Sequence, residues 1–190
     1  MPEHYICEQQ FEQVDFSVDG LTATEFEQCT FSHCNFSTFS PGSITFMDCI
    51  FNNCNMSMAN LQGTALRDVQ FEDCKLVGIH FENCNPFLFS ASFKNCQLHL
   101  SSFYAMKIKK IKFDDCGLQE VDFTSADLTG ATFNNCDLAA TLFNKTKLAK
   151  ADLRTAYNYS IDPEINDIKK ARFSLHGIPG LLDKYDIVVE

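Results

Sequence analysis

The sequence predicts a repeat solenoid in which the chain turns one corner every five residues. The stretch Phe-Asn-Asn-Cys stands at residues 51–54 and again at 133–136, and related stretches recur with a spacing of 20 residues. One step, from Phe71 to Phe93, is 22 residues long, so two residues are inserted in that copy. A period of five fits neither a helix, which repeats about every 3.6 residues, nor a strand, which repeats about every two. It fits a chain that bends at regular corners and points the same residues inward each time.

Each five-residue unit carries a large apolar residue at its centre and a small or β-branched residue two positions earlier. Fifteen of the nineteen phenylalanines occupy the central position, and nine of the ten cysteines occupy the small one. The other three positions are mostly polar or charged. We therefore expect two side chains of every unit to point into a core and three to face solvent. The seven clearest copies begin at Phe11, Phe31, Phe51, Phe71, Phe93, Phe113 and Phe133.

The first, irregular coil is expected to begin within residues 1–10. The stretches SADLTGATF at residues 125–133 and LAKADL at 148–153 come closest to a consensus A(D/N)LXX, and from Cys7 to Leu153 the chain resembles the pentapeptide-repeat family. The resemblance implies an all-β solenoid, a right-handed quadrilateral β-helix with four units per coil. Residues 1–153 would form about seven coils, with the insertion near residues 84–89. At a strand spacing of roughly 4.8 Å, seven coils make a rod on the order of 35 Å long.

The cysteines are interpreted as small buried apolar residues that fill space between stacked rings. Six of them share one column: Cys34, Cys54, Cys74, Cys96, Cys116 and Cys136. Side chains that point inward in one column rarely offer the dihedral angle of a disulfide. Metal binding favours Cys-x-x-Cys or interleaved histidine, whereas Cys29 and Cys34 are five residues apart. We expect no metal and no cofactor, and free thiols without an apolar leader in residues 1–10 indicate a reducing cytoplasm.

Residues 154–190 are expected to form a separate helical segment that caps the solenoid or joins two copies. A helix is expected to begin with Asp162 as its N-cap and Pro163 in its first position. A short helix from Ile178 and a hydrophobic strand at Ile187–Val189 are expected to follow.

This tail resembles the tail of a topoisomerase-directed group within the family, namely the Qnr proteins, MfpA and the microcin B17 immunity protein McbG. In that group the final helices and the apolar terminal segment join two rods tail to tail, which implies a homodimer here. The matching interface residues are Pro163, Ile165, Leu181, Leu182, Ile187, Val188 and Val189. The alternative is a monomer whose tail only caps its own last coil.

The exterior carries no catalytic pattern, so we do not expect an enzyme. The five histidines share no repeat column, and the sequence has no nucleophile elbow, HExxH motif, phosphate loop or dinucleotide fingerprint. The formal net charge of −10 argues against direct nucleic acid binding, which requires a basic surface. No apolar run approaches the length of a membrane-spanning helix, so no membrane association is expected.

Acidic side chains gather along the edge that carries the Phe-x-x-Cys units. We predict that this acidic edge, interleaved with asparagines, binds a partner. Its carboxylates are Glu12, Asp15, Glu72, Asp73, Asp114, Asp115 and Asp137, interrupted by Lys75 and Lys94. The far side of the C-terminal coils is predicted to be basic through Lys107–Lys112, Lys145, Lys147 and Lys150. For either patch, ordinary solvation of outward positions is the alternative.

An acidic rod that pairs tail to tail resembles the topoisomerase-directed group, whose members are similar to duplex DNA in width, length and charge. The resemblance implies a DNA mimic that occupies the DNA-binding saddle of DNA gyrase or topoisomerase IV. Such a protein protects the enzyme from a quinolone or a peptide toxin, giving antibiotic resistance or toxin immunity, or restrains its activity. Charge complementarity would steer this contact.

Two features depart from that group. Many Qnr proteins carry long loops, whereas here only two residues are inserted, around Asn85–Phe89. We expect a local bulge in which one of Phe87, Leu88 and Phe89 is exposed and the other two pack. The lysines of Lys107–Lys112 do not fit an imitation of DNA. The alternative function is a non-catalytic interaction scaffold with an unrelated cytoplasmic protein partner.

Overall fold

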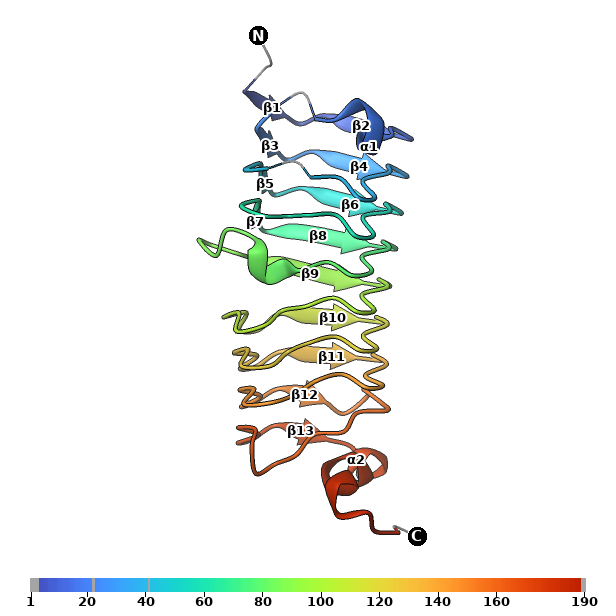
Figure 1. Cartoon of the computed structure of the whole chain (residues 1–190), viewed down its shortest axis with the longest axis vertical. Coiled ribbons are helices and arrows are strands. Elements are labelled where there is room, and N and C mark those ends of the chain that lie inside the picture. The colour runs from blue at the N-terminus through green and yellow to red at the C-terminus, as the bar shows by residue number, and fades with distance from the viewer. Residues whose placement is uncertain (1–3, 22, 41, 189–190) are drawn as a thin grey trace.

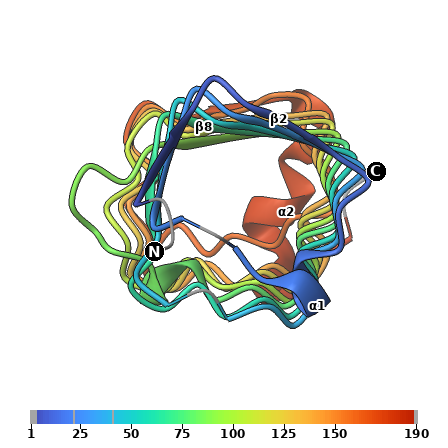
Figure 2. The same ribbon diagram turned by 90° about the horizontal axis from the view of Figure 1, so that it is seen from above.

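The computed structural model describes residues 4–21, 23–40 and 42–188, which form one elongated rod (Figure 1). The strands pair in parallel with those of the neighbouring coils, and the end strands of each sheet pair on one side only. The register advances by 20 residues per coil, with Phe31 opposite Phe51 and Phe113 opposite Phe133. Seen along the rod, the coils superimpose into a four-sided outline (Figure 2). The predicted all-β solenoid, a quadrilateral β-helix, is confirmed.

Two of the four faces carry strands. The long sheet contains β2 (Gln10–Glu12), β4 (Thr30–Ser32), β6 (Ile50–Asn52), β8 (Val69–Glu72), β9 (Ala91–Lys94), β10 (Lys112–Asp114), β11 (Thr132–Asn134), β12 (Asp152–Leu153) and β13 (Arg172–Phe173). The short sheet contains β1 (Tyr5–Cys7), β3 (Glu25–Glu27), β5 (Thr45–Met47) and β7 (Ala65–Arg67). On the other faces the coils meet at isolated bridges, such as Asn35 with Asn55 and Ser102 with Asp122.

The helical segments are short and lie at the two ends and at the insertion. Helix α1 (Phe16–Asp19) follows β2, and η1 (Phe81–Asn83) precedes the insertion. The segments η2 (Leu175–Gly177), α2 (Pro179–Leu182) and η3 (Asp183–Tyr185) follow the last strand and cover the C-terminal end of the rod (Figure 1).

The core is a stack of phenylalanine rings behind the long sheet. Consecutive rings lie almost parallel, with centroids 4.7 Å apart for Phe31 and Phe51 and 5.3 Å apart for Phe71 and Phe93. Rings of neighbouring columns meet edge to face, as Phe93 and Phe103 do at 6.0 Å. Both geometries suit the quadrupole of the ring. Because the stack continues from Phe71 to Phe93, the insertion does not divide the core.

The corners of the coils are of two kinds. Where a small or β-branched residue other than cysteine follows the corner, its N–H usually closes a turn, as in Ala131 N to Leu128 O at 2.9 Å and Ala151 N to Leu148 O at 2.9 Å. At eight Phe-x-x-Cys corners among the described residues, the cysteine N–H makes no such bond. We call these closed and open corners. The residue just before the small position has positive φ at both kinds, 51° for Asn135 and 60° for Lys150.

The cysteine thiols interact with carbonyls near the open corners. Cys54 Sγ donates to Phe31 O of the preceding coil at 3.3 Å, and Cys74 Sγ donates to Phe51 O at 3.3 Å. Thr141 does the same with a hydroxyl, donating to Leu118 O at 2.7 Å. All ten thiols are free, and every one except Cys7 is buried. The cysteines therefore supply a weak hydrogen-bond donor as well as the predicted small volume.

The solenoid continues beyond Leu153, so the predicted boundary between residues 153 and 154 falls inside it. Strand β13 pairs with β12, and Asp167 pairs with Lys147. The small position persists through Ala156, Ile161 and Asn166, which are buried. Asn166 Nδ2 donates to Phe143 O at 3.0 Å, in the place a thiol takes elsewhere. The rod therefore has about eight coils rather than seven.

The prediction of a helix that begins at Asp162 and Pro163 is wrong. Asp162 Oδ1 accepts a bond from Glu164 N at 2.9 Å, but only a turn follows. The buried side chains of Ile161 and Asn166, five residues apart, keep this segment on the coil path instead. Ile187 and Val188 are not in a strand as predicted, and Val189 lies outside the described residues.

The inserted residues form a bulge that projects from the four-sided outline (Figure 2). Phe87 and Leu88 are 64% and 63% exposed, while Phe89 packs partly against the core. The bulge was predicted, but two of its three apolar side chains are exposed rather than one. Val69 N bonds to Ser90 O at 3.1 Å and Ser90 N to Leu66 O at 3.0 Å, which returns the chain to register before β9.

Candidate interaction surfaces

The acidic edge lies where the strands of the long sheet end. Each strand delivers its last residue and the following corner residue to solvent, and the next unit adds a third outward side chain. None of the seven predicted carboxylates is buried: Glu12, Asp15, Glu72, Asp73, Asp114, Asp115 and Asp137 all face outward. The 20-residue register aligns them along the rod, because equivalent positions of successive coils stand side by side.

Amide side chains join the carboxylates into a ladder. Asn135 Nδ2 donates to Asp115 Oδ1 at 3.1 Å, and Asn95 Nδ2 donates to Asp73 Oδ1. Asp137 Oδ1 accepts from Asn158 at 2.9 Å. These bonds span one coil step each and orient the carboxylates without neutralising them.

At the N-terminal end of the edge, hydrogen bonds favour the charged form of Asp15. The Ser17 hydroxyl and then the Asn35 amide lower the pKa of this carboxyl, and Asn35 Nδ2 lies 3.0 Å from its Oδ1. In the middle of the edge, Lys94 Nζ lies 3.6 Å from Glu72 Oε1, so this carboxylate has a cation beside it. The edge is therefore most strongly negative toward its two ends.

The charge density of the edge can be compared with that of DNA. From Glu12 to Asp137 the edge spans six coil steps, which is about 29 Å at a spacing of roughly 4.8 Å. Duplex DNA carries about one negative charge per 1.7 Å, or about 17 charges over that length. The edge has seven carboxylates. It therefore reproduces the sign and linear arrangement of the phosphates at less than half their density.

Six of the seven predicted dimer residues lie at the C-terminal end of the rod and differ in exposure, and the seventh, Val189, lies outside the described residues. Ile165, Ile187 and Val188 are exposed, at 48%, 56% and 86%. Pro163, Leu181 and Leu182 are half-buried. Leu175, which the sequence reasoning missed, is 89% exposed and extends the same apolar end.

The tail is fixed to the last coil by polar contacts and by close packing. Lys184 Nζ lies 2.7 Å from Asp162 Oδ1 and 2.7 Å from Glu164 Oε2, and the bond from Lys184 lowers the pKa of Asp162. Ile161 N donates to Gly180 O at 2.8 Å. A Cβ on Gly180 would collide with the carbonyl oxygen of Tyr159, which explains the glycine. The apolar end is thus presented by an ordered cap.

Most of the predicted basic patch lies on the face of the short sheet. We name this the split face: it comprises β1, β3, β5 and β7 and, beyond the insertion, the units centred on Ile108, Leu128, Leu148 and Ile168. Its lysines are Lys107, Lys109, Lys110, Lys147, Lys150, Lys169 and Lys170, whereas Lys112 belongs to the long sheet. The sequence reasoning missed the acidic side chains on the same face before the insertion, namely Glu8, Glu25, Glu27, Asp48 and Asp68. Sorting those units by column would have found them.

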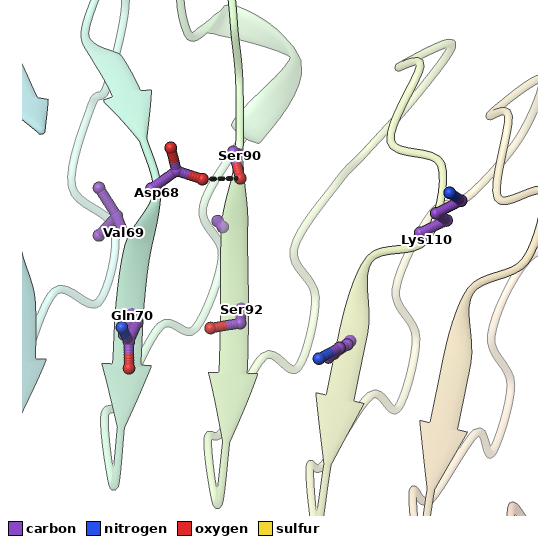
Figure 3. A pocket seen from close by; sticks show the side chains of 8 residues that line it. Asp68, Val69, Gln70, Ser90, Ser92 and Lys110 are labelled. Carbon is purple, nitrogen blue, oxygen red and sulfur yellow. Dashed lines mark hydrogen bonds between the residues drawn. The ribbon is translucent and has the colours of Figure 1, made fainter. Parts of the chain in front are cut away.

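An open groove of about 400 Å³ lies where the split face meets the long sheet (Figure 3). Asp68 Oδ1 accepts from Ser90 Oγ at 2.8 Å, and Ser92 and Lys110 line the groove nearby. In the part of the chain that the structure describes, no cluster of three His, Cys, Asp or Glu could hold a metal ion. Over the same residues, no helix has the length and apolarity needed to cross a membrane.

Comparison with known proteins identifies the repeat. A family profile described as pentapeptide repeat region matches residues 24–86, 44–113 and 76–153. No curated protein sequence matches the chain.

Two solved structures share the fold. The rod is similar to HetL, a pentapeptide repeat protein involved in heterocyst differentiation regulation from the cyanobacterium Nostoc sp. strain PCC 7120, at 18% identity over 91% of this chain and 85% of that chain, with a TM-score of 0.61. It is also similar to full-length QnrB1, a plasmid-mediated fluoroquinolone resistance protein, at 15% identity over 96% of this chain and 100% of that chain, with a TM-score of 0.53. At these identities the likeness shows the fold.

Proposed function

This chain belongs to the pentapeptide-repeat family, and we propose that it is a DNA-mimicking protein that binds a type II DNA topoisomerase, either DNA gyrase or topoisomerase IV. The observation that carries the proposal is the acidic edge, whose seven carboxylates face outward in coil register along a rigid rod. The fluoroquinolone resistance named for QnrB1, whose fold the rod shares along its whole length, supports the same class of target.

The edge is suited to a basic channel because it is ordered before binding. The amide ladder through Asp73, Asp115 and Asp137 holds the carboxylates in place, so little side-chain freedom is lost on contact. Since the charge density is below that of DNA, the edge contributes steering and register more than affinity. Occupying the DNA-binding saddle in this way would protect the enzyme from a quinolone or a peptide toxin, or restrain its activity, in the cytoplasm.

We further propose that the tail forms a homodimer. Exposed apolar side chains gather at an ordered end of the rod, among them Ile187, Val188 and Leu175. A two-fold contact between two such ends would bury them and double the length of the acidic edge.

A supercoiling assay tests the topoisomerase proposal. Purified gyrase, and topoisomerase IV in a parallel decatenation assay, are titrated with the protein, with and without a quinolone or microcin B17, and with the variant Asp114→Asn/Asp115→Asn. Asparagine keeps the shape and suits the φ of 53° at position 115, so the variant should fold unchanged. We expect rescue or inhibition at micromolar protein or below, weakened roughly tenfold in this variant.

The matched control is Asp19→Asn/Glu120→Gln, which removes the same charge from exposed positions off the acidic edge. It should behave as the parent protein does. Equal loss in both variants would assign the effect to net charge rather than to the edge. If neither enzyme responds with or without poison, the scaffold with an unrelated partner becomes the better account.

A further inference from the structure

The split face carries opposite charges on either side of the insertion. Before the insertion, its four units present five carboxylates and one arginine, Arg67. Beyond it, the next four units present seven lysines and two aspartates, Asp127 and Asp167. All of these side chains are exposed or half-buried. The insertion therefore stands at the centre of a face whose four units on one side carry five carboxylates and one arginine, a net charge of −4, and whose four units on the other side carry seven lysines and two aspartates, a net charge of +5.

The two halves are largely complementary in charge when a second copy is laid antiparallel on this face. The two copies are related by a two-fold axis that lies between them, runs parallel to the strands and passes through the insertion. This axis brings the second coil of one copy opposite the eighth coil of the other. Positions within the unit are preserved, because strands of both copies then run the same way. Glu25 comes opposite Lys147, and Glu27 comes opposite Ala149, beside Lys150.

The same operation brings two further pairs of oppositely charged units together, whereas the units centred on Phe46 and Leu128, which also meet, carry only carboxylates, Asp48 and Asp127. Glu8 comes opposite Lys170, and Asp68 comes opposite Lys110, in each case at the corner position of the unit. The like charges Arg67 and Lys109 also meet, but each already has a partner in its own chain: Arg67 stacks on the Phe87 ring at 5.6 Å, and Lys109 lies 3.5 Å from Asp127. Opposite charges therefore face each other at four positions in each copy.

The centre of the face is apolar. Phe87 and Leu88 project from the bulge, and a groove of about 530 Å³ beside it is lined in part by Pro86, Phe89 and Met106. This groove lies on the C-terminal side of the bulge, whereas Phe87 leans over Arg67 on the N-terminal side. Because the two-fold axis passes through the insertion, the apolar side chains of the two bulges come together at the centre of the contact.

We propose that the split face is a self-complementary interface on which a second copy of this chain docks antiparallel, side by side. It is distinct from the tail contact, and it leaves the acidic edge free, because that edge lies at the opposite ends of the long-sheet strands. Exposed ion pairs contribute only about 0.2–1 kcal/mol each. The apolar centre therefore supplies most of the affinity, and the charges set orientation and partner.

A charge-swap experiment tests this interface by itself. All proteins are full-length and carry Ile187→Asp/Val188→Asp, which removes the tail contact. One variant adds Glu25→Lys/Glu27→Lys, and a second adds Lys147→Glu/Lys150→Glu. We expect the background protein to dimerise reversibly at low salt in sedimentation equilibrium. Each variant by itself should dimerise at least about 30-fold more weakly, equivalent to about 2 kcal/mol.

The mixture of the two variants is the decisive measurement. In a mixed pair, positions 25 and 27 of each copy face positions 147 and 150 of the other with opposite charges, as they do in the background protein. Equimolar mixing should therefore restore dimerisation to within about threefold of the background, all of it as heterodimer by native mass spectrometry. The control Asp114→Lys/Asp115→Lys alters the acidic edge and should leave dimerisation unchanged.

A background protein that stays monomeric, a mixture that stays monomeric, or single variants that still dimerise would each overturn the proposal. None of these readings involves a topoisomerase. A failure here therefore leaves the proposed topoisomerase function untouched, and a silent supercoiling assay leaves this interface untouched.

Discussion

The long sheet and the split face share the five-residue period but differ in the residues that fill it and in the backbone structure that results. The long sheet keeps the Phe-x-x-Cys unit in six of its coils and pairs through nine strands without interruption. On the split face, a cysteine stands three residues after Phe26 and Phe46, whereas an alanine stands three residues after Leu128 and Leu148. The units with cysteine form strands with open corners. The units with alanine form closed corners, and neighbouring coils meet there only at single bridges.

The difference teaches where the fold tolerates change. The ring stack and the strand pairing of the long sheet pass directly from Phe71 to Phe93, although two extra residues separate them. The split face absorbs both residues, because Asn85 N still bonds to Thr64 O at 2.8 Å and Ser90 N to Leu66 O. Only the segment between these two anchors leaves the coil path. The long sheet thus holds the rod together, and the split face is free to vary.

The largest expected effect comes from breaking the ring stack. Phe113 is fully buried between Phe93 and Phe133, with centroids 5.2 and 5.3 Å away. Phe113→Ala removes both contacts and leaves a cavity, so we expect a loss of about 3–5 kcal/mol in the free energy of unfolding. Urea denaturation measures it. The matched variant Phe87→Ala alters a ring that is 64% exposed on the bulge and should change stability by less than about 0.5 kcal/mol. Equal losses would contradict the division of roles between the two faces.

Much of the fold could be predicted because each five-residue unit forms one side of a four-sided coil. The inward and outward positions, the coil register and the location of the insertion all follow from where Phe and Cys recur. The eighth coil was missed because Asn158 and Pro163 break the series of large residues, although Ala156, Ile161 and Asn166 continue the small one. In that coil the small position keeps the chain on its path without the ring stack.

The candidate surfaces were predicted only in part. The acidic edge was found because its carboxylates recur at three neighbouring positions beside the Phe-x-x-Cys units. The acidic half of the split face was missed because its side chains are spread over four coils at different positions of the unit, as Glu8 and Glu25 show. The direction in which Phe87 leans could not be predicted at all, since it depends on packing against Arg67 from another coil.

The second effect concerns the thiols of the open corners. Burial raises the pKa of Cys49 from 9.0 to about 12, so the folded protein holds this proton where the unfolded chain releases it. The stabilisation is complete below pH 9 and is lost as the pH rises from 9 toward 12. We expect this thiol to lower the free energy of unfolding by about 1.4 kcal/mol per pH unit in that window. Urea denaturation at pH 8, 9 and 10 measures the slope.

The control removes the thiol and keeps the site. Cys49→Ala should reduce the slope between pH 9 and 10 by about 1.4 kcal/mol per pH unit, because the other buried thiols, such as Cys84, still contribute. Val69→Ala, one coil later at the same position of the unit and buried to the same degree, should lower stability without changing the slope. An unchanged slope in Cys49→Ala would show that other groups govern the alkaline loss. The test compares two corners of the split face that differ in the thiol alone.

The smallest effect concerns the corner residue itself. On the long sheet the positive-φ position is often Asn or Asp, as at Asn53, Asp73 and Asn135, and both residues tolerate this backbone better than lysine does. The basic half of the split face places Lys150 there, with φ of 60°. Lys150→Asn should therefore stabilise the protein by about 0.5 kcal/mol, measured by thermal or urea denaturation.

Lys147→Asn provides the matched control for this last comparison. It removes the same charge from the same coil at an exposed position where φ is not positive, so it isolates electrostatics from backbone strain. If both variants stabilise equally, repulsion among the lysines rather than the corner geometry limits this face. If only Lys150→Asn stabilises, the basic half retains lysine at a strained corner. A retained lysine there is what an interface that needs the charge near Glu27 would require.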